Sequence, residues 1–197
     1  MSGAFVVIGG SAGGIEALEL IFRQLPSDFA APILIVEHLH PSDDGALARH
    51  LAHLTGLRVL EPSDKTPIAA GHVYTAPANY HMLVERPGNI SLSVDDRVNW
   101  SRPSIDVLFE SAAHAWGSAL VAVILSGANG DGANGLKAVK VAGGRTIAQK
   151  PQDAASPQMP QAAIDTGAVD EVLRADSIAQ RLVMLCQCHD LVTRKKP

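Results

Sequence analysis

Short apolar runs that end in glycine or proline alternate with helical patterns along most of this chain, and this rhythm constrains its fold more than any other feature. The first run, residues 5–8, is rich in β-branched residues and leads into a glycine-rich stretch. A helical pattern follows over residues 15–25, and Pro26 ends it. This alternation predicts an α/β fold with a doubly wound, mainly parallel sheet and helices on both faces.

The remaining elements follow from the same reasoning. Further strands are predicted at 32–36, 57–60, 119–125, 145–148 and 168–172, and further helices after Asp44 and at 103–116, 133–141 and 177–185. Three short runs at 71–76, 81–84 and 90–93, separated by turn residues, predict a small antiparallel hairpin section. Without repeats or a clear linker, residues 1–197 are expected to form one domain, with a core of about 5–186 and a tail of 187–197.

Composition and charge exclude several classes of function. Hydrophobic residues make up 47% of the chain and aromatic residues only 4%, which argues against stacking platforms for single-stranded nucleic acid. The net charge is -4, and the basic residues are scattered apart from a solvated run at 194–196. No apolar run reaches the roughly 18 residues of a membrane span, and no signal peptide is visible. We expect a cytoplasmic protein without nucleic-acid or membrane partners.

The two cysteines, Cys186 and Cys188, are too few for a disulfide framework. Together with His189 they form a weak metal-binding pattern, because no second pair of ligands accompanies them. We therefore expect neither a metal nor another cofactor.

The loop after the first predicted strand contains a candidate nucleophile. Residues 9–13 read G-G-S-A-G, matching G-x-S-x-G, in which small neighbours let a sharp turn lift the hydroxyl of Ser11 clear of the sheet. A dinucleotide-binding loop would instead need glycine at position 11, with Glu37 only loosely placed as its acidic residue. A glycine-rich turn that binds nothing is the third interpretation of this loop.

A nucleophilic serine needs a base and a carboxylate that orients the base. His38 ends the second predicted strand, at the same sheet edge as Ser11, and His40 has a similar but weaker claim. Asp131 lies in the glycine-rich loop after the most apolar strand. Its simpler role would be to cap the helix that follows, and one residue could serve both purposes.

Several stretches together resemble a known family. They are VIGGSAGG (7–14), EHL (37–39), GHVY (71–74), RPSIDVLF (102–109), LSG through DG (125–132), AGG (142–144) and GAVDEV (167–172). In order and spacing these stretches resemble the catalytic domain of chemotaxis protein-glutamate methylesterases (CheB-type), over residues 6–185.

The resemblance implies a serine esterase that hydrolyses glutamate methyl esters on chemoreceptors to glutamate and methanol. Family members often also deamidate receptor glutamines. The family's nucleophile, histidine and aspartate match Ser11, His38 rather than His40, and Asp131. Backbone N–H groups of Ala12 and Ala128 are expected to stabilise the oxyanion.

The chain departs from the family pattern around these residues. Ala12 replaces a common threonine, and Ala128 and Asn129 change two residues of the aspartate loop; asparagine tolerates a left-handed backbone there. Glu37 replaces a common glutamine, and its carboxylate would raise the pKa of His38 if it faced the ring.

Many family members also carry an N-terminal receiver domain. Ser11 lies so near the start of this sequence that we expect a stand-alone domain, either ungated or controlled by a separate receiver-domain partner. The alternative hypothesis is a non-catalytic or weakly active interaction module of the same fold in a signalling complex.

Overall fold

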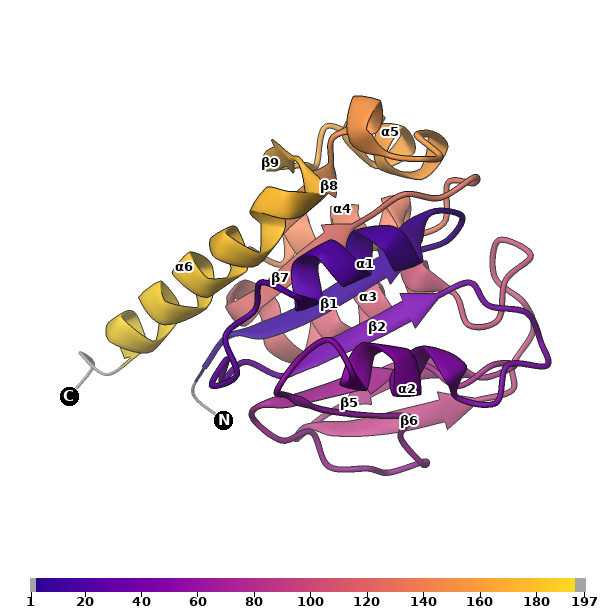
Figure 1. Cartoon of the computed structure of the whole chain (residues 1–197), viewed down its shortest axis with the longest axis horizontal. Coiled ribbons are helices and arrows are strands. Elements are labelled where there is room, and N and C mark those ends of the chain that lie inside the picture. Colours follow the sequence, from indigo (N-terminus) through magenta and orange to yellow (C-terminus); the bar gives the residue numbers. More distant parts are fainter. Residues whose placement is uncertain (1–2, 194–197) are drawn as a thin grey trace.

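A parallel sheet covered on both faces by helices forms the body of the molecule (Figure 1). The computed structural model describes residues 3–193, with side chains as far as residue 187. Its seven strands lie in the order β3-β4-β2-β1-β7-β8-β9 and all pair in parallel. Their bounds are β1 Phe5–Gly10, β2 Ile33–Glu37, β3 Arg58–Leu60, β4 His72–Thr75, β7 Leu120–Ile124, β8 Arg145–Gln149 and β9 Glu171–Leu173. The predicted doubly wound α/β fold is confirmed.

Two hydrophobic clusters sit on opposite faces of this sheet, because successive strand residues point to opposite sides. In β1, Val6 and Ile8 face one cluster, whereas Phe5 and Val7 face the other. The first cluster is covered by α1 Gly14–Phe22, α2 Ala46–Ala52 and α6 Ala175–Thr193. The second is covered by α3 Ile105–Trp116, α4 Ala133–Val141 and α5 Gln158–Asp165.

The hairpin section is smaller than the sequence predicted. Of the three predicted runs, only the two that form β5 His81–Glu85 and β6 Asn89–Ser93 pair antiparallel with each other. The run at 71–76 forms β4, which joins the main parallel sheet between β2 and β3. Val73 and Tyr74 are buried on opposite faces of that sheet, so polar and apolar residues do not alternate along this short strand. Without that alternation, the sequence does not indicate which strands it pairs with.

Two helices differ from the prediction. The sequence analysis did not predict α5, which follows a short 3-10 turn at Pro151–Asp153 (η2). Helix α6 continues to Thr193, so most of the expected tail is helical, and the basic run 194–196 lies outside the described residues. None of the described helices combines the length and apolarity that crossing a bilayer would demand.

The topological switch point of the sheet, where the chain begins to add strands on the other side of β1, lies between β1 and β7. The loop after β1 leads to α1 on one face, and the loop after β7 leads to α4 on the other. Open α/β sheets bind their ligands at the carboxyl edge of the sheet, beside the loops that diverge at such a point. Both Ser11 and Asp131 belong to these two loops.

Candidate active site

The backbone holds Ser11 between the ends of the two strands that flank β1. The Ser11 N–H donates to the carbonyl of Ser126, beyond β7, at 2.9 Å, and the Ser11 carbonyl accepts from the N–H of Gly14 at 2.6 Å. Gly13 adopts a left-handed conformation with φ 80°, which lets the chain turn into α1 at once. The predicted turn therefore brings the half-buried serine to the edge of the sheet.

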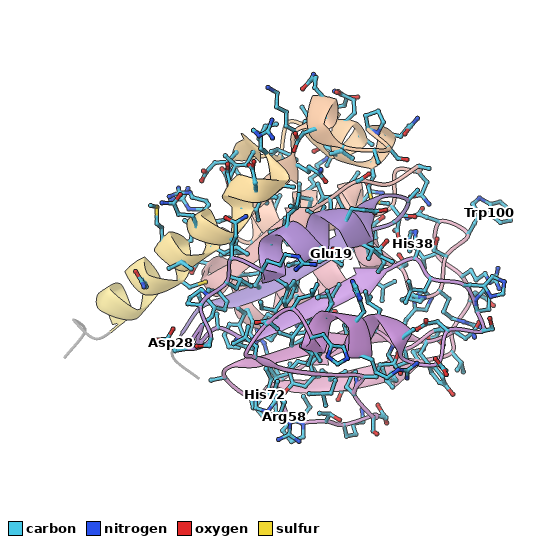
Figure 2. The ribbon with its side chains drawn as sticks, in the orientation of Figure 1. Glu19, Asp28, His38, Arg58, His72 and Trp100 are labelled. Carbon is cyan, nitrogen blue, oxygen red and sulfur yellow. The ribbon has the colours of Figure 1, made fainter. Side chains whose placement is uncertain are left out.

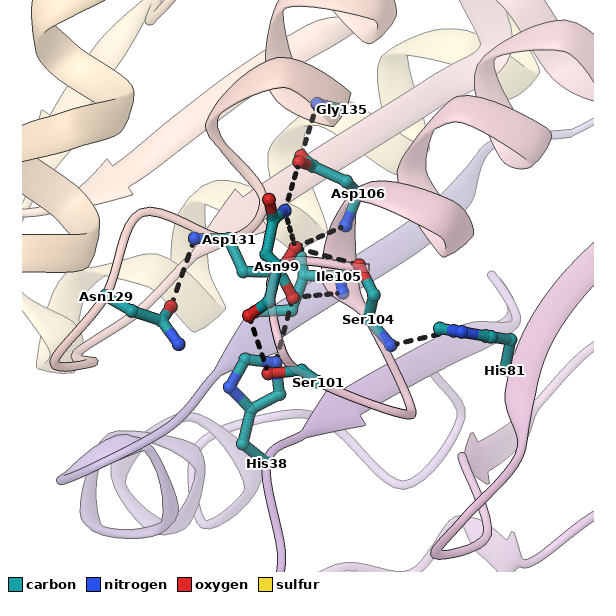
Figure 3. Close-up of polar contacts among 10 residues, drawn as sticks. All are labelled: His38, His81, Asn99, Ser101, Ser104, Ile105, Asp106, Asn129, Asp131 and Gly135. Carbon is teal, nitrogen blue, oxygen red and sulfur yellow. Dashed lines mark hydrogen bonds and ion pairs between the residues drawn. The ribbon is translucent and has the colours of Figure 1, made fainter. Parts of the chain in front are cut away.

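His38 is the first residue after β2, and its N–H donates to the carbonyl of Gly10 at 3.1 Å. This bond continues the β1–β2 register and places His38 beside Ser11 along the edge. The ring Nε2 lies 2.9 Å from Oδ2 of Asp131, and the two side chains are 12% and 0% exposed (Figure 3). Two of the three predicted residues, from loops 93 positions apart, are thus in direct contact.

The tautomer of His38 follows from its partner. An ionised carboxylate only accepts hydrogen bonds, so Nε2 carries the ring proton in the neutral imidazole. Nδ1 has no hydrogen-bond partner within the described residues and remains a free acceptor. No hydrogen bond joins the Ser11 hydroxyl to the His38 ring in the described part of the structure. His40 instead bonds Ser42 through Nδ1 at 2.7 Å and is exposed.

The buried carboxylate of Asp131 lies against the N-terminus of α3 and does not cap α4, the helix that follows it in the sequence. Its carboxylate accepts hydrogen bonds from His38, the Asn99 side chain (2.8 Å), the Ser104 hydroxyl (2.8 Å) and the N–H groups of Ile105 (2.7 Å) and Asp106 (3.3 Å). Helix α4 begins after Gly132, whose φ is 93°, without a side-chain cap. The expected capping role therefore belongs to a helix 26 residues earlier in the sequence.

These donors decide the charge of Asp131. Burial raises its pKa, but the hydrogen bonds from His38, Asn99 and the α3 backbone outweigh burial and hold the pKa below its ordinary value. The neighbouring Asp106 accepts bonds from the Gly135 N–H (2.7 Å) and from Asn99 (2.8 Å). Burial, reinforced by the charge of Asp131, raises the pKa of Asp106. Asn99 thus bridges two carboxyl groups and keeps the one beside His38 ionised.

Asn99 is a site residue that the sequence analysis missed. Val98 and Ser101 exchange two backbone hydrogen bonds, of 3.2 and 2.9 Å, around Asn99 and Trp100, whose φ angles are 51° and 64°. Positive φ at both central positions defines a type I′ turn. The usual sequence signal, asparagine followed by glycine, is absent here, so the turn was not predicted.

Glu37 faces away from His38 and Asp131, so the condition under which its carboxylate would act on the His38 ring is not met. Its side chain is 3% exposed and fills the space left by Gly10 and Gly14, where a Cβ atom would overlap the carboxyl group. Its Oε2 has no hydrogen-bond partner among the described residues. Burial, with a smaller contribution from the charge of Glu16, raises its pKa well above the ordinary value. Adjacent strand residues point to opposite faces, which separates Glu37 from the ring of His38.

The two expected oxyanion donors are exposed and available. In the described residues, the N–H groups of Ala12 and Ala128 donate to no protein acceptor. The buried Ser126 hydroxyl donates to the carbonyl of Ala12 at 2.7 Å and thereby fixes the serine loop. Asn129 does not adopt the left-handed conformation that asparagine tolerates, and its side chain accepts from the Asp131 N–H at 3.0 Å.

A cavity of about 460 Å³ lies at the opposite, amino-terminal edge of the sheet. Its lining includes Phe5, Pro32 and Cys186, and none of Ser11, His38 or Asp131. This hollow is therefore separate from the candidate active site.

The fold and the site together define a class of protein, the α/β enzymes with the side chains of a serine hydrolase at the carboxyl edge of a parallel sheet. The family model described as CheB methylesterase matches residues 6–182. The chain belongs to the CheB methylesterase family, as the resemblance indicated.

Individual relatives agree with this assignment. A putative protein-glutamate methylesterase/protein-glutamine glutaminase of Leptospira interrogans is 46% identical over 182 residues, covering 92% of this chain and 94% of the relative. A protein-glutamate methylesterase/protein-glutamine glutaminase of Symbiobacterium thermophilum is 41% identical over 90% of this chain, which spans 49% of that longer relative. The crystal structure of the Thermotoga maritima CheB methylesterase catalytic domain superimposes with a TM-score of 0.90 at 36% identity, over 94% of this chain and 100% of that one.

Proposed function

We propose that this chain is a serine esterase that hydrolyses glutamate methyl esters on chemoreceptor cytoplasmic domains and releases methanol. The observation that carries the proposal is the hydrogen bond between His38 and Asp131 at the carboxyl edge of the sheet, where the His38 backbone is bonded to Gly10, the residue before Ser11. The same acyl chemistry applied to a glutamine side chain would release ammonia, which accounts for the double name of the relatives.

In the first step, Nδ1 of His38 takes the proton of the Ser11 hydroxyl as Oγ attacks the ester carbonyl. This nitrogen is the free one, because Nε2 is bonded to Asp131. The charged imidazolium is stabilised by the Asp131 carboxylate, whose lowered pKa keeps it ionised. The imidazolium then returns the proton to the departing methoxy oxygen, and methanol leaves an acyl-enzyme.

In the second step, water gives a proton to His38 and its oxygen attacks the acyl group. As the bond from the acyl carbon to Oγ breaks, His38 returns that proton to Oγ, which restores the Ser11 hydroxyl and leaves glutamate on the receptor. The N–H groups of Ala12 and Ala128 would bind the oxyanion in both steps. Loss of one such donor typically costs about 10² to 10³ in rate. Rotation of the Ser11 side chain would complete the contact with His38, since such bonds often tighten only when substrate binds.

Ser11→Ala tests the nucleophile directly. We expect methanol release from methylated receptor fragments to vanish and labelling by a fluorophosphonate probe to be lost, because no other side chain would supply the attacking oxygen. The unfolding temperature should stay close to that of the unmodified protein. Wild-type rates of methanol release in the variant would refute the assignment.

We also propose an intracellular setting, in which the enzyme is either ungated or regulated by a separate receiver-domain partner. Methanol release should be measured with and without candidate receiver-domain proteins, since a separate partner would change the rate and an ungated enzyme would not respond. A folded wild-type protein that neither releases methanol nor reacts with the probe would favour the interaction module over the esterase.

A further inference from the structure

The tip of the turn that carries Asn99 presents a large apolar side chain to solvent. Trp100 is 93% exposed, and its indole extends away from the body of the molecule at the end of the sheet where His38 lies (Figure 2). Val94 and Val98 in the same loop are 65% and 37% exposed. Tryptophan at this exposure gains almost nothing from burial within the chain itself.

The backbone of Trp100 is held in an unfavourable conformation for its residue type. Its φ of 64° occupies the second central position of a type I′ turn, where glycine is the preferred residue. A bulky side chain with positive φ is a genuine outlier, and such strain persists only where the surroundings enforce it. Since the indole is exposed, contacts within the described residues do not offset the strain.

The loop around the turn is fixed to the scaffold from several sides. The Asn99 side chain bonds the carboxylates of Asp131 and Asp106, both at 2.8 Å. Arg102 donates to the carbonyls of Val94 and Asp95 at 2.6 and 2.9 Å. Nε2 of the buried His81 lies 3.0 Å from the carbonyl of Asp96. Its Nδ1 accepts from the Ser104 N–H at 3.2 Å (Figure 3). The indole is therefore presented by a rigid support.

The position of the turn links the indole to catalysis. Asn99, the preceding residue, contacts the carboxylate that bonds His38, so Trp100 stands at the rim of the candidate active site. Tryptophan is one of the residue types enriched among those that dominate protein–protein binding. A small ester that reacts at Ser11 needs no such contact.

We propose that Trp100 is a specificity-determining residue that packs on apolar side chains of the polypeptide segment carrying the methyl ester. The inference rests on the proposed function and deepens it. Contact with Trp100 would make the enzyme selective for a protein substrate over a small ester of the same chemistry.

Trp100→Gly tests this role, because glycine suits the turn. We expect an unfolding temperature equal to or above that of wild type, and p-nitrophenyl acetate hydrolysis and fluorophosphonate labelling within about twofold of it. The kcat/KM for methylated receptor fragments should fall at least about tenfold, mainly through KM, as expected for a dominant binding residue. Trp100→Phe should recover most of the loss. Val141→Ala, at the far end of α4 and 81% exposed, is the matched control and should change neither substrate.

Three outcomes would overturn the inference. Undiminished kcat/KM for the protein substrate in Trp100→Gly removes the docking role. An equal loss for p-nitrophenyl acetate shows instead that the turn acts through Asn99 on Asp131. A dimer in sedimentation that dissociates in Trp100→Gly assigns the indole to contact between copies of this chain.

A binding measurement separates this inference from the proposed function. Calorimetry with methylated fragments compares Ser11→Ala with Ser11→Ala/Trp100→Gly, where no turnover occurs. Equal affinities overturn the role of Trp100 even if wild type releases methanol. Weaker binding by the double variant, with no methanol release by wild type, supports Trp100 and overturns the esterase.

Discussion

At the scale of single residues, Asp131 joins the chemistry to the fold. Its carboxylate bonds the His38 ring and at the same time accepts hydrogen bonds from two N–H groups in the first turn of α3. Orphan N–H groups at a helix start favour a negative charge, and the charge in turn favours a protonated imidazole beside it. One ionised group therefore stabilises the native helix and, in the proposed mechanism, the charged imidazolium of His38.

Asp131→Asn should lower both activity and stability. An amide in place of one carboxylate oxygen cannot accept every bond that His38, Ile105 and their neighbours donate. We expect methanol release to slow by about 10³- to 10⁴-fold, by analogy with the loss of an orienting aspartate in other triads. The free energy of unfolding should fall by about 1–3 kcal/mol, measured by denaturant titration.

Ser104→Ala is the matched control, because it removes one hydroxyl donor to Asp131 and leaves the carboxylate in place. Its rate should fall much less than that of Asp131→Asn. Equal rates for the two variants would mean that the carboxylate has no special role.

The sequence located some of these residues better than others. Ser11, His38 and Asp131 each follow a strand, so predicting the strands was enough to place them at one edge. Asn99 reaches Asp131 from a type I′ turn, and such a turn is normally predicted from a glycine at its second central position. With tryptophan at the position where glycine is usual, the sequence does not predict that turn, and only the tertiary structure shows it.

At the scale of elements, helix α5 supports the loop that carries Asp131. The Gly127 N–H donates to the carbonyl of Ser156 at 3.0 Å, and the Gly127 carbonyl accepts from the Met159 N–H at 2.9 Å. A Cβ atom on Gly127 would come within 2.5 Å of the Met159 side chain. The glycine therefore allows the loop to approach α5 closely.

Gly127→Ala should destabilise the protein by about 1–3 kcal/mol, because the added methyl group overpacks this contact. Displacement of the neighbouring Ala128 N–H should also reduce methanol release. Adding Met159→Ala should recover part of the activity, and the coupling between the two changes should be about 0.5–3 kcal/mol in a double-mutant cycle.

Gly130→Ala provides the comparison in the same loop, since its Cβ would meet only Ala162, at an ordinary 3.6 Å. Its unfolding free energy should stay the same or rise by up to about 1 kcal/mol. A similar loss of stability in both glycine variants would point to loop stiffness rather than contact with Met159.

At the scale of the whole molecule, the buried Glu37 makes global stability depend on pH. Because its pKa is raised in the folded state, the folded protein retains a proton that the unfolded chain loses near pH 4.5. The free energy of unfolding should therefore fall as pH rises from about 4.5 to the raised pKa, and stay lower above it. The slope in that window is at most about 1.4 kcal/mol per pH unit.

Glu37→Gln should remove this dependence, since the amide is nearly isosteric and never ionises. We expect the variant to be more stable than wild type at neutral pH and similar to it below pH 4.5, in denaturant titrations at a series of pH values. Glu16→Gln, an exposed neighbour, should reproduce only a small part of the gain. Wild-type and Glu37→Gln curves that stay parallel across pH would show that burial of this carboxyl carries no cost.

The sequence by itself determined the α/β class, the strands and the edge at which Ser11, His38 and Asp131 gather. It could do so because polarity period and strand ends are local properties of a chain. Only the tertiary structure decided that β4 joins the main sheet, that Asp131 caps α3 instead of α4, and that Glu37 is buried away from the ring. Those outcomes depend on which distant segments meet, and the free energy of such contacts is absent from any local pattern.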